Sequence, residues 1–192
     1  TGTSGEPAQG SVSQTFGKTW AGGGLVLAYE LSRRDALAGA DRRFAASADL
    51  RPLGGSDWRL ANAFPGNILL PDPLTRALVP AYAIPAGQTG VGLRPDALQA
   101  GVVNRTNQRQ GTDILPRQTL NAVYAAAEQA LGDRLKLTAD ARYSARRYKS
   151  HGTAIATNLT VTSANPFYVS PIGAASQTIA YSFAEEAENP VA

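Results

Sequence analysis

The sequence predicts an all-β protein built from antiparallel strands, on three observations. Residues 134–144 alternate between apolar and polar side chains with almost no exceptions. Short glycine-containing turns at 21–24 and 132–133 adjoin further alternating segments. Two long segments, 34–117 and 146–176, lack a sustained period. Because successive side chains of a strand point to opposite faces, the first observation indicates a strand with one apolar and one charged face.

The alternating segment 134–144 has the features of a membrane-crossing strand. Its odd positions are leucine, alanine and tyrosine, whereas its even positions include lysine, aspartate and arginine. Its length is close to the roughly 9–11 residues with which a tilted strand crosses a bilayer. Lipid on one side and a wet, charged lumen on the other would explain both faces. We therefore expect the strands to form part of a transmembrane β-barrel.

The rest of the chain fits the same architecture. Residues 1–10 are rich in glycine, serine and threonine and predict a flexible lead-in, with a partial barrel over 11–192. Short turns on one side and long loops on the other are typical of outer-membrane barrels, so we expect ordered extracellular loops at 34–117 and 146–176. The predicted strands lie near 11–20, 25–33, 118–130, 134–144 and 177–185.

Local rules disagree over residues 119–131. Alanine favours helix, Leu120 and Tyr124 fit a helical stripe, and Gly132 could end the helix. The same residues also share a strand face, and Gly132 with Asp133 would form a two-residue turn into the next strand. A soluble α+β domain with 119–131 helical is therefore the alternative fold class.

Composition excludes several classes of function. The chain has 192 residues and no cysteine, which removes disulfides and thiolate chemistry. It also has no methionine, which predicts that the native start is missing. Its 18 lysines and arginines are spread among 15 acidic residues, in contrast to the concentrated basic stripe of nucleic-acid-binding proteins. We expect no nucleic-acid partner. No apolar run approaches the roughly 20 residues of a membrane helix.

Side chains suited to catalysis or metal binding are scarce. His151 is the one histidine and has no neighbouring acidic cluster, so we expect a solvated loop residue, no metal site, no cofactor and no enzymatic activity. Aromatic rings stack on sugars and arginine binds anionic chelates, which directs attention to the long loop. The candidate ligand-binding residues there are Trp58, Arg59, Tyr82, Asn104 and Arg105.

Several segments resemble the early barrel region of TonB-dependent outer-membrane receptors of the proteobacterial type. They are residues 27–37 (LAYELSRRDAL), 49–55 (DLRPLGG), 65–67 (PGN), 111–117 (GTDILPR) and 165–169 (NPFYV). These are barrel and loop phrases typical of that family, and they carry no catalytic signature. The resemblance extends over most of the chain between the lead-in and the C-terminal end.

The resemblance implies a fold, a location and a set of partners. It implies a 22-stranded barrel with an N-terminal plug in the outer membrane of a Gram-negative bacterium, with 119–131 as a strand. It also implies TonB-dependent uptake of a siderophore, cobalamin or oligosaccharide. The implied partners are outer-membrane lipid, the small-molecule or oligosaccharide ligand, the rest of the barrel and plug, and TonB through the plug.

The chain departs from the family pattern in ways that bear on function. It shows no plug, no TonB box and no C-terminal strand ending in an aromatic residue. About five strands cannot close a barrel, for which eight is the usual minimum. Either further strands come from sequence not shown, or the region adopts another arrangement. The alternative function is a soluble ligand- or protein-binding module without catalysis.

Overall fold

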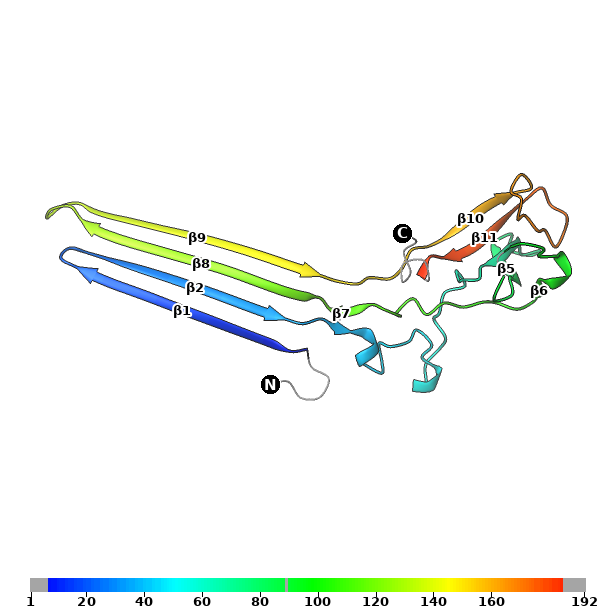
Figure 1. Ribbon diagram of the computed structural model, residues 1–192, viewed down its shortest axis with the longest axis horizontal. Coiled ribbons are helices and arrows are strands. Elements are labelled where there is room, and N and C mark those ends of the chain that lie inside the picture. The colour runs from blue at the N-terminus through cyan, green and yellow to red at the C-terminus, as the bar shows by residue number, and fades with distance from the viewer. Residues whose placement is uncertain (1–6, 89, 185–192) are drawn as a thin grey trace. The chain divides into compact units, whose positions relative to one another are not determined.

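The fold is described from a computed structural model, which places residues 7–88 and 90–184 (Figure 1). These residues form antiparallel sheets with almost no helix, which confirms the predicted all-β class. The chain divides into two compact units, treated separately below. We call residues 1–42 with 111–152 the long-strand unit, and 43–110 with 153–192 the small-sheet unit. No helix in the described ranges combines the length and hydropathy needed to cross a membrane.

Four long strands lie side by side in the main sheet of the long-strand unit (Figure 1). Each neighbouring pair is antiparallel, and its register runs unbroken from end to end. Beyond one end, β3 (Leu37–Ala38) pairs with β7 (Asp113–Leu115). The order of the main sheet is β1 (Gln9–Trp20), β2 (Gly23–Arg34), β8 (Arg117–Ala130) and β9 (Lys136–Lys149).

Strand β8 settles the conflict between helix and strand. It pairs with β2 on one side and with β9 on the other along nearly its whole length, so both edges of its backbone are hydrogen-bonded. Helix propensities differ by less than about 1 kcal/mol per residue among ordinary residues, and tertiary pairing overrides them. The strand interpretation of 119–131 is confirmed, and the α+β alternative that required a helix there is wrong.

The two hairpin turns of this sheet differ in length. Trp20 pairs with Gly23, which leaves a two-residue turn whose Gly22 has a φ of 78°. Ala130 pairs with Lys136, so the second connection spans the five residues 131–135. The predicted two-residue turn at 132–133 is wrong. The backbone N–H of Leu131 donates to the carbonyl oxygen of Leu135 at 2.7 Å, so the connection is longer than two residues.

Strand boundaries also differ from the prediction. Strand β1 begins at Gln9, inside the predicted lead-in, while residues 1–6 lie outside the described part of the chain. Strand β9 starts at Lys136 and runs to Lys149, past the predicted end at 144. Pairing with β8 continues to Arg117, and this long-range partner extends β9 beyond its clearest alternation.

The small-sheet unit contains most of the two segments predicted as long loops. These segments are not irregular throughout, because they carry six complete paired strands and three short 3-10 helices. Two of these strands and one helix lie in the long-strand unit, and the other four strands join the strand predicted at 177–185 in a five-stranded sheet. The helices are Gly39–Asp41, Arg51–Leu53 and Pro95–Ala97. The five strands lie in the order β10 (Ala156–Thr162), β11 (Ser176–Ser182), β4 (Asn67–Pro71), β5 (Leu78–Ala83) and β6 (Gln99–Ala100).

Strand β11 does not lie beside the four long strands, in contrast to its place in the predicted barrel. The sequence prediction counted 177–185 among the barrel strands, whereas β11 pairs with β10 and β4 in the small sheet. Residue 185 lies outside the described residues. Alternation showed that the segment is a strand, but alternation carries no information about which strand lies beside it.

The core of the small-sheet unit includes the fully buried amide of Asn67. Ile68 and Asn67 are the largest fully buried side chains, at 1% and 0% exposure. The Asn67 Nδ2 group donates to the carbonyl oxygens of Ala61 and Asn104, and its Oδ1 accepts from Asn104 N at 2.8 Å. One side chain therefore holds two loop segments against strand β4.

Candidate functional site

The register of the long-strand sheet sorts its side chains onto two faces. Directly opposed residues of an antiparallel pair share a face, so each register row crosses all four strands. One row consists of Phe16, Leu27, Ala125 and Ala141. The next row consists of Thr15, Ala28, Tyr124 and Arg142. We call the face of the first row the apolar face and that of the second row the polar face.

The apolar face is uncovered within the described structure. Val12 is 67% exposed, Phe16 55% and Tyr143 66%. A sheet in water normally buries its apolar face against another layer, so this face needs an apolar medium or an apolar partner. Between the Val12 row and the Trp20 row its large side chains are Val12, Phe16, Trp20, Leu25, Leu27, Tyr29, Leu31, Val123, Leu137 and Tyr143.

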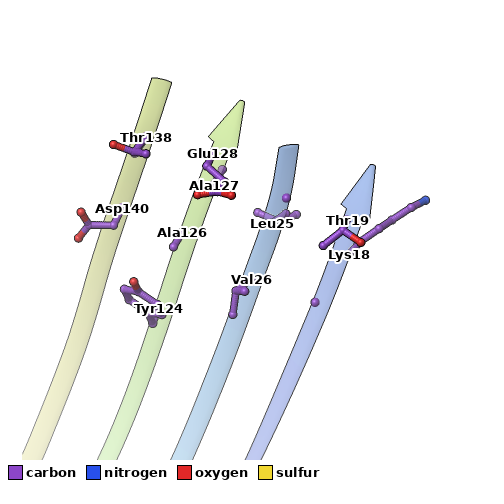
Figure 2. Close-up of a pocket in the computed structure, with 13 residues that line it drawn as sticks. Lys18, Thr19, Leu25, Val26, Tyr124, Ala126, Ala127, Glu128, Thr138 and Asp140 are labelled. Atoms are coloured by element: carbon purple, nitrogen blue, oxygen red, sulfur yellow. The ribbon is translucent and has the colours of Figure 1, made fainter. Parts of the chain in front are cut away.

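One charged residue, Lys18, lies on the apolar face between those two rows. It belongs to β1, an edge strand of the described sheet, and extends away from the other three strands (Figure 2). It is also close to the turn that ends β1. Long cationic side chains near the end of a membrane segment can carry their charge to the interface while the stem stays apolar.

A polar contact crosses the sheet at the turn end. Trp20 Nε1 donates to Gln129 Oε1 at 2.7 Å, and Gly23 of β2 lies between them in the same row. A Cβ added at Gly23 would lie 2.8 Å from Trp20 Nε1 and 2.5 Å from the Glu128 carbonyl oxygen. The missing side chain of Gly23 therefore makes room for the indole to reach β8.

The polar face is lined mainly by glycine, alanine, serine and threonine, with a few charges. Two shallow depressions of about 520 and 410 Å³ open on this face, and residues from all four strands line each of them. Figure 2 shows the larger of the two. The Arg142 guanidinium lies 5.5 Å from the centre of the Tyr124 ring, and Lys136 Nζ lies 2.8 Å from Glu128 Oε2.

The small-sheet unit contains two copies of one local ion-pair motif, Asp-x-Arg. Arg51 Nε and Nη2 lie 2.8 and 2.6 Å from the Asp49 carboxylate, and Arg59 makes the same pair of bonds to Asp57 at 3.0 and 2.8 Å. An antiparallel bridge joins Asp49 to Asp57, so each arginine Nη2 also lies 3.4 Å from the other aspartate. We call these residues, with Arg105, the Asp–Arg cluster.

The ion pairs shift the titration of the cluster. The hydrogen bond from the Arg59 side chain lowers the pKa of Asp57, and that from Arg51 lowers the pKa of Asp49. In return, the hydrogen bond to Asp49 raises the pKa of Arg51. All these groups are charged at neutral pH, and much of the arginines' hydrogen-bonding capacity is used within the cluster.

The predicted ligand-binding residues therefore fall into different settings. Arg59 and Arg105 belong to the Asp–Arg cluster, where Arg105 Nη1 donates to the Arg59 carbonyl oxygen at 3.1 Å. Trp58 lies between Asp57 and Arg59 in the chain and is 66% exposed. Asn104 donates to the carbonyl oxygens of Pro65 and Ile84, and it supports the loop.

Tyr82 is set apart from that cluster. It is half-buried in β5, paired with Ile68 and Ala100. The structure thus groups Trp58, Arg59 and Arg105, and it assigns Asn104 a structural role. Sequence reasoning missed the acidic partners Asp49 and Asp57, although the repeated Asp-x-Arg spacing is visible in the sequence.

His151 is an exposed loop residue, as expected, and it also has an acidic partner. Its Nδ1 lies 3.0 Å from Asp113 Oδ2, and its backbone N–H donates to the same oxygen at 2.8 Å. The backbone hydrogen bond from His151 is the main cause of a lowered Asp113 pKa. The pair continues the contact between β7 and the chain after β9. Among the described residues, no group of three or more histidine, cysteine or acidic side chains could hold a metal ion.

Comparison of the chain with protein-family models, with curated proteins and with solved structures gives no significant match.

Proposed function

We propose that the long-strand sheet is a section of the wall of an outer-membrane β-barrel, and that the chain is part of a receptor for TonB-dependent uptake. The observation that carries the membrane assignment is the apolar face, which is exposed across four long strands with a single charge among its central rows. The uptake assignment comes from the resemblance of the barrel and loop segments.

The dimensions of the apolar face suit a bilayer. Eight residues separate the Trp20 row from the Val12 row, which corresponds to about 27 Å along a strand. With the 35–45° tilt of barrel strands, that length spans about 20 Å of membrane, near the height of the apolar band of such barrels. Tyr29 and Tyr143 share one row near one limit of this band, and Trp20 lies at the other. Aromatic residues are enriched at membrane interfaces.

The side chains of the polar face are consistent with a water-filled lumen on that side of the sheet. Its small side chains leave two depressions, each of which reaches across all four strands. Charges at Glu30, Asp140 and Arg142 would be solvated there. The same charges would be costly in lipid, so only one orientation of the sheet is compatible with a bilayer.

The connections add a second asymmetry. Two short turns join β1 to β2 and β8 to β9, whereas β2 and β9 continue at their other ends into the long chain segments that form the small-sheet unit. Short turns on the periplasmic side and long loops outside are typical of outer-membrane barrels. In this proposal the small-sheet unit is an extracellular structure, where Trp58, Arg59 and Arg105 would meet a siderophore, cobalamin or oligosaccharide ligand.

The proposal requires additional strands. Within the described residues, β1 and β9 each have one edge that pairs with nothing, and open edges are excluded from lipid. A closed barrel needs at least eight strands, so β1 and β9 would pair with strands of the rest of the receptor.

A site-directed spin-label scan along β9 in lipid vesicles tests the membrane assignment. We expect oxygen, which concentrates in lipid, to broaden labels at odd positions such as Leu137 and Ala141. A water-soluble nickel chelate should broaden labels at even positions such as Thr138 and Asp140. Accessibility to the chelate at every position would support a soluble binding module instead, and a period near 3.6 would contradict the strand itself.

The cysteine-free chain also permits a test of topology. A single cysteine at Leu74, which is 92% exposed in the small-sheet unit, should react with an impermeant thiol reagent on intact cells that produce the receptor. A cysteine at Asp133, in the turn between β8 and β9, should react only after the outer membrane is breached. The reverse pattern would invert the topology, and equal labelling would contradict it.

A further inference from the structure

We propose that the loop end of the apolar face binds the phosphate headgroups of anionic lipids. This inference rests on the membrane assignment above. Four cationic side chains lie on this face beyond the apolar band, in two adjacent register rows. The first row contains Arg33, Thr119 and Arg147, and the second contains Arg117 and Lys149.

The register brings together charges that are far apart in the sequence. Arg33 and Arg147 flank Thr119 on neighbouring strands, which sets their backbones about 10 Å apart. Arg117 pairs directly with Lys149. One acidic residue joins the patch, because Asp35 Oδ1 lies 3.4 Å from Arg117 Nε. The patch therefore carries a surplus of positive charge.

All four cations can reach a ligand. Each is exposed, and the Arg117 side chain keeps 68% of its surface accessible despite its ion pair. Within the described part of the chain, Arg33, Arg147 and Lys149 have no carboxylate within 4.0 Å. Arg33 and Arg147 are therefore not neutralised by the sheet that carries them, whereas Lys149 interacts electrostatically with the Asp113 carboxylate.

The position of the patch selects a lipid over a soluble anion. The Arg33 row lies two residues, or about 7 Å, beyond the Leu31 row that ends the apolar band. A lipid whose acyl chains cover Leu31 would bring its headgroup to this level. The polar face at the same end carries Arg34 and Arg146, which point to the opposite side of the sheet and would face the lumen.

A vesicle flotation assay with matched variants tests the lipid contact on the closed receptor barrel that contains this chain, because β1 and β9 need neighbouring strands before they can enter lipid. We compare recovery with phosphatidylcholine vesicles alone and with vesicles that also contain phosphatidylglycerol, at low ionic strength. Arg33→Gln combined with Arg147→Gln should weaken binding to the anionic vesicles roughly thirty-fold, from about five-fold for each cation near the surface. Binding to neutral vesicles should not change.

Arg34→Gln combined with Arg146→Gln is the control. It removes the same charge from adjacent positions on the same two strands, but from the polar face. We expect it to retain wild-type preference for anionic vesicles. An equal loss in both double variants would overturn the lipid contact and indicate a general effect of net charge. Binding of inorganic phosphate to the vesicle-free protein that Arg33→Gln with Arg147→Gln abolishes, while flotation with anionic vesicles is unchanged, would overturn the choice of lipid as the source of the phosphate.

The assay separates failure of this inference from failure of the proposed function. Wild-type chain that inserts equally into neutral and anionic vesicles would overturn the lipid-binding patch and leave the membrane assignment standing. A chain recovered with neither kind of vesicle would overturn both.

Discussion

The two units of this protein handle apolar and polar groups in opposite ways. The long-strand unit satisfies its backbone through strand pairing and leaves Val12, Phe16 and Tyr143 exposed. The small-sheet unit buries a small core around Ile68 and satisfies loop backbone through the side chains of Asn67 and Asn104. The first arrangement suits a wall between lipid and water, and the second suits a loop structure in water.

The exposure of an apolar side chain therefore has a different meaning in each unit. In the small-sheet unit, burial is a guide to stability. In the long-strand unit, the exposed apolar side chains form the surface that would contact lipid in the proposed barrel. The two tryptophans allow each unit to be followed separately, because Trp20 lies in the long-strand unit and Trp58 in the small-sheet unit. Replacement of either one by phenylalanine leaves a reporter for the other unit.

The largest expected effect is on the small-sheet unit. Asn67→Leu keeps similar volume but leaves the carbonyls of Ala61 and Asn104 and the N–H of Asn104 without their partner. We expect the free energy of unfolding to fall by about 3 kcal/mol or more, measured by denaturant with Trp58 fluorescence. Asn62→Leu removes a half-buried amide and should cost less than about 1 kcal/mol. Equal losses would contradict the central role of Asn67.

The next effect belongs to the long-strand unit. Gly23→Ala places a methyl group 2.5 Å from the Glu128 carbonyl oxygen and 2.8 Å from Trp20 Nε1. We expect a loss of about 2 kcal/mol in detergent micelles and a changed Trp20 emission spectrum, because the indole must leave Gln129. Gly24→Ala is the neighbouring control, since its nearest contact is Thr19 Cγ2 at 3.5 Å. An unchanged Trp20 signal in Gly23→Ala would disprove the crossing of the indole over β2.

A pH-dependent effect is expected in the small-sheet unit. The Arg59 hydrogen bond holds the pKa of Asp57 below its usual range, so ionised Asp57 stabilises the folded state above the unfolded pKa of about 3.9. This stabilisation is lost as pH falls through the lower folded pKa. Asp57→Asn should therefore be less stable than wild type near neutral pH, with the difference closing below about pH 4. Asp96→Asn, at an exposed carboxylate, should follow the wild-type pH curve.

The smallest expected effect concerns the polar face. Arg142→Gln removes the cation above the Tyr124 ring and should cost about 0.5–1 kcal/mol in detergent micelles. Arg146→Gln, on the same face and strand, should cost less. Denaturant unfolding followed by Trp20 fluorescence measures both. A larger loss in Arg146→Gln would argue against the Arg142–Tyr124 contact.

Local patterns were sufficient for several strands and one turn. Strict alternation in 134–144 and 25–33 predicted strands, because an alternating pattern buries one face only in extended backbone. Consecutive glycines after Trp20 predicted the first tight turn. The loop residues Trp58, Arg59 and Arg105 were predicted by residue type. Their grouping around Asp49 and Asp57 depends on the isolated antiparallel bridge that joins these two aspartates.

By itself, the sequence determined the all-β class, the two faces of the alternating strands and the supply of aromatic and cationic residues. That the alanine-rich segment is strand β8 follows from tertiary pairing, because its partner β2 is remote in sequence and, together with the adjacent β9, outweighs helix propensity. Tertiary pairing also placed β11 in the small sheet and brought Arg33 and Arg147 to either side of Thr119 in one register row. A strand's period is a local property, whereas its neighbours and register depend on contacts between distant parts of the chain.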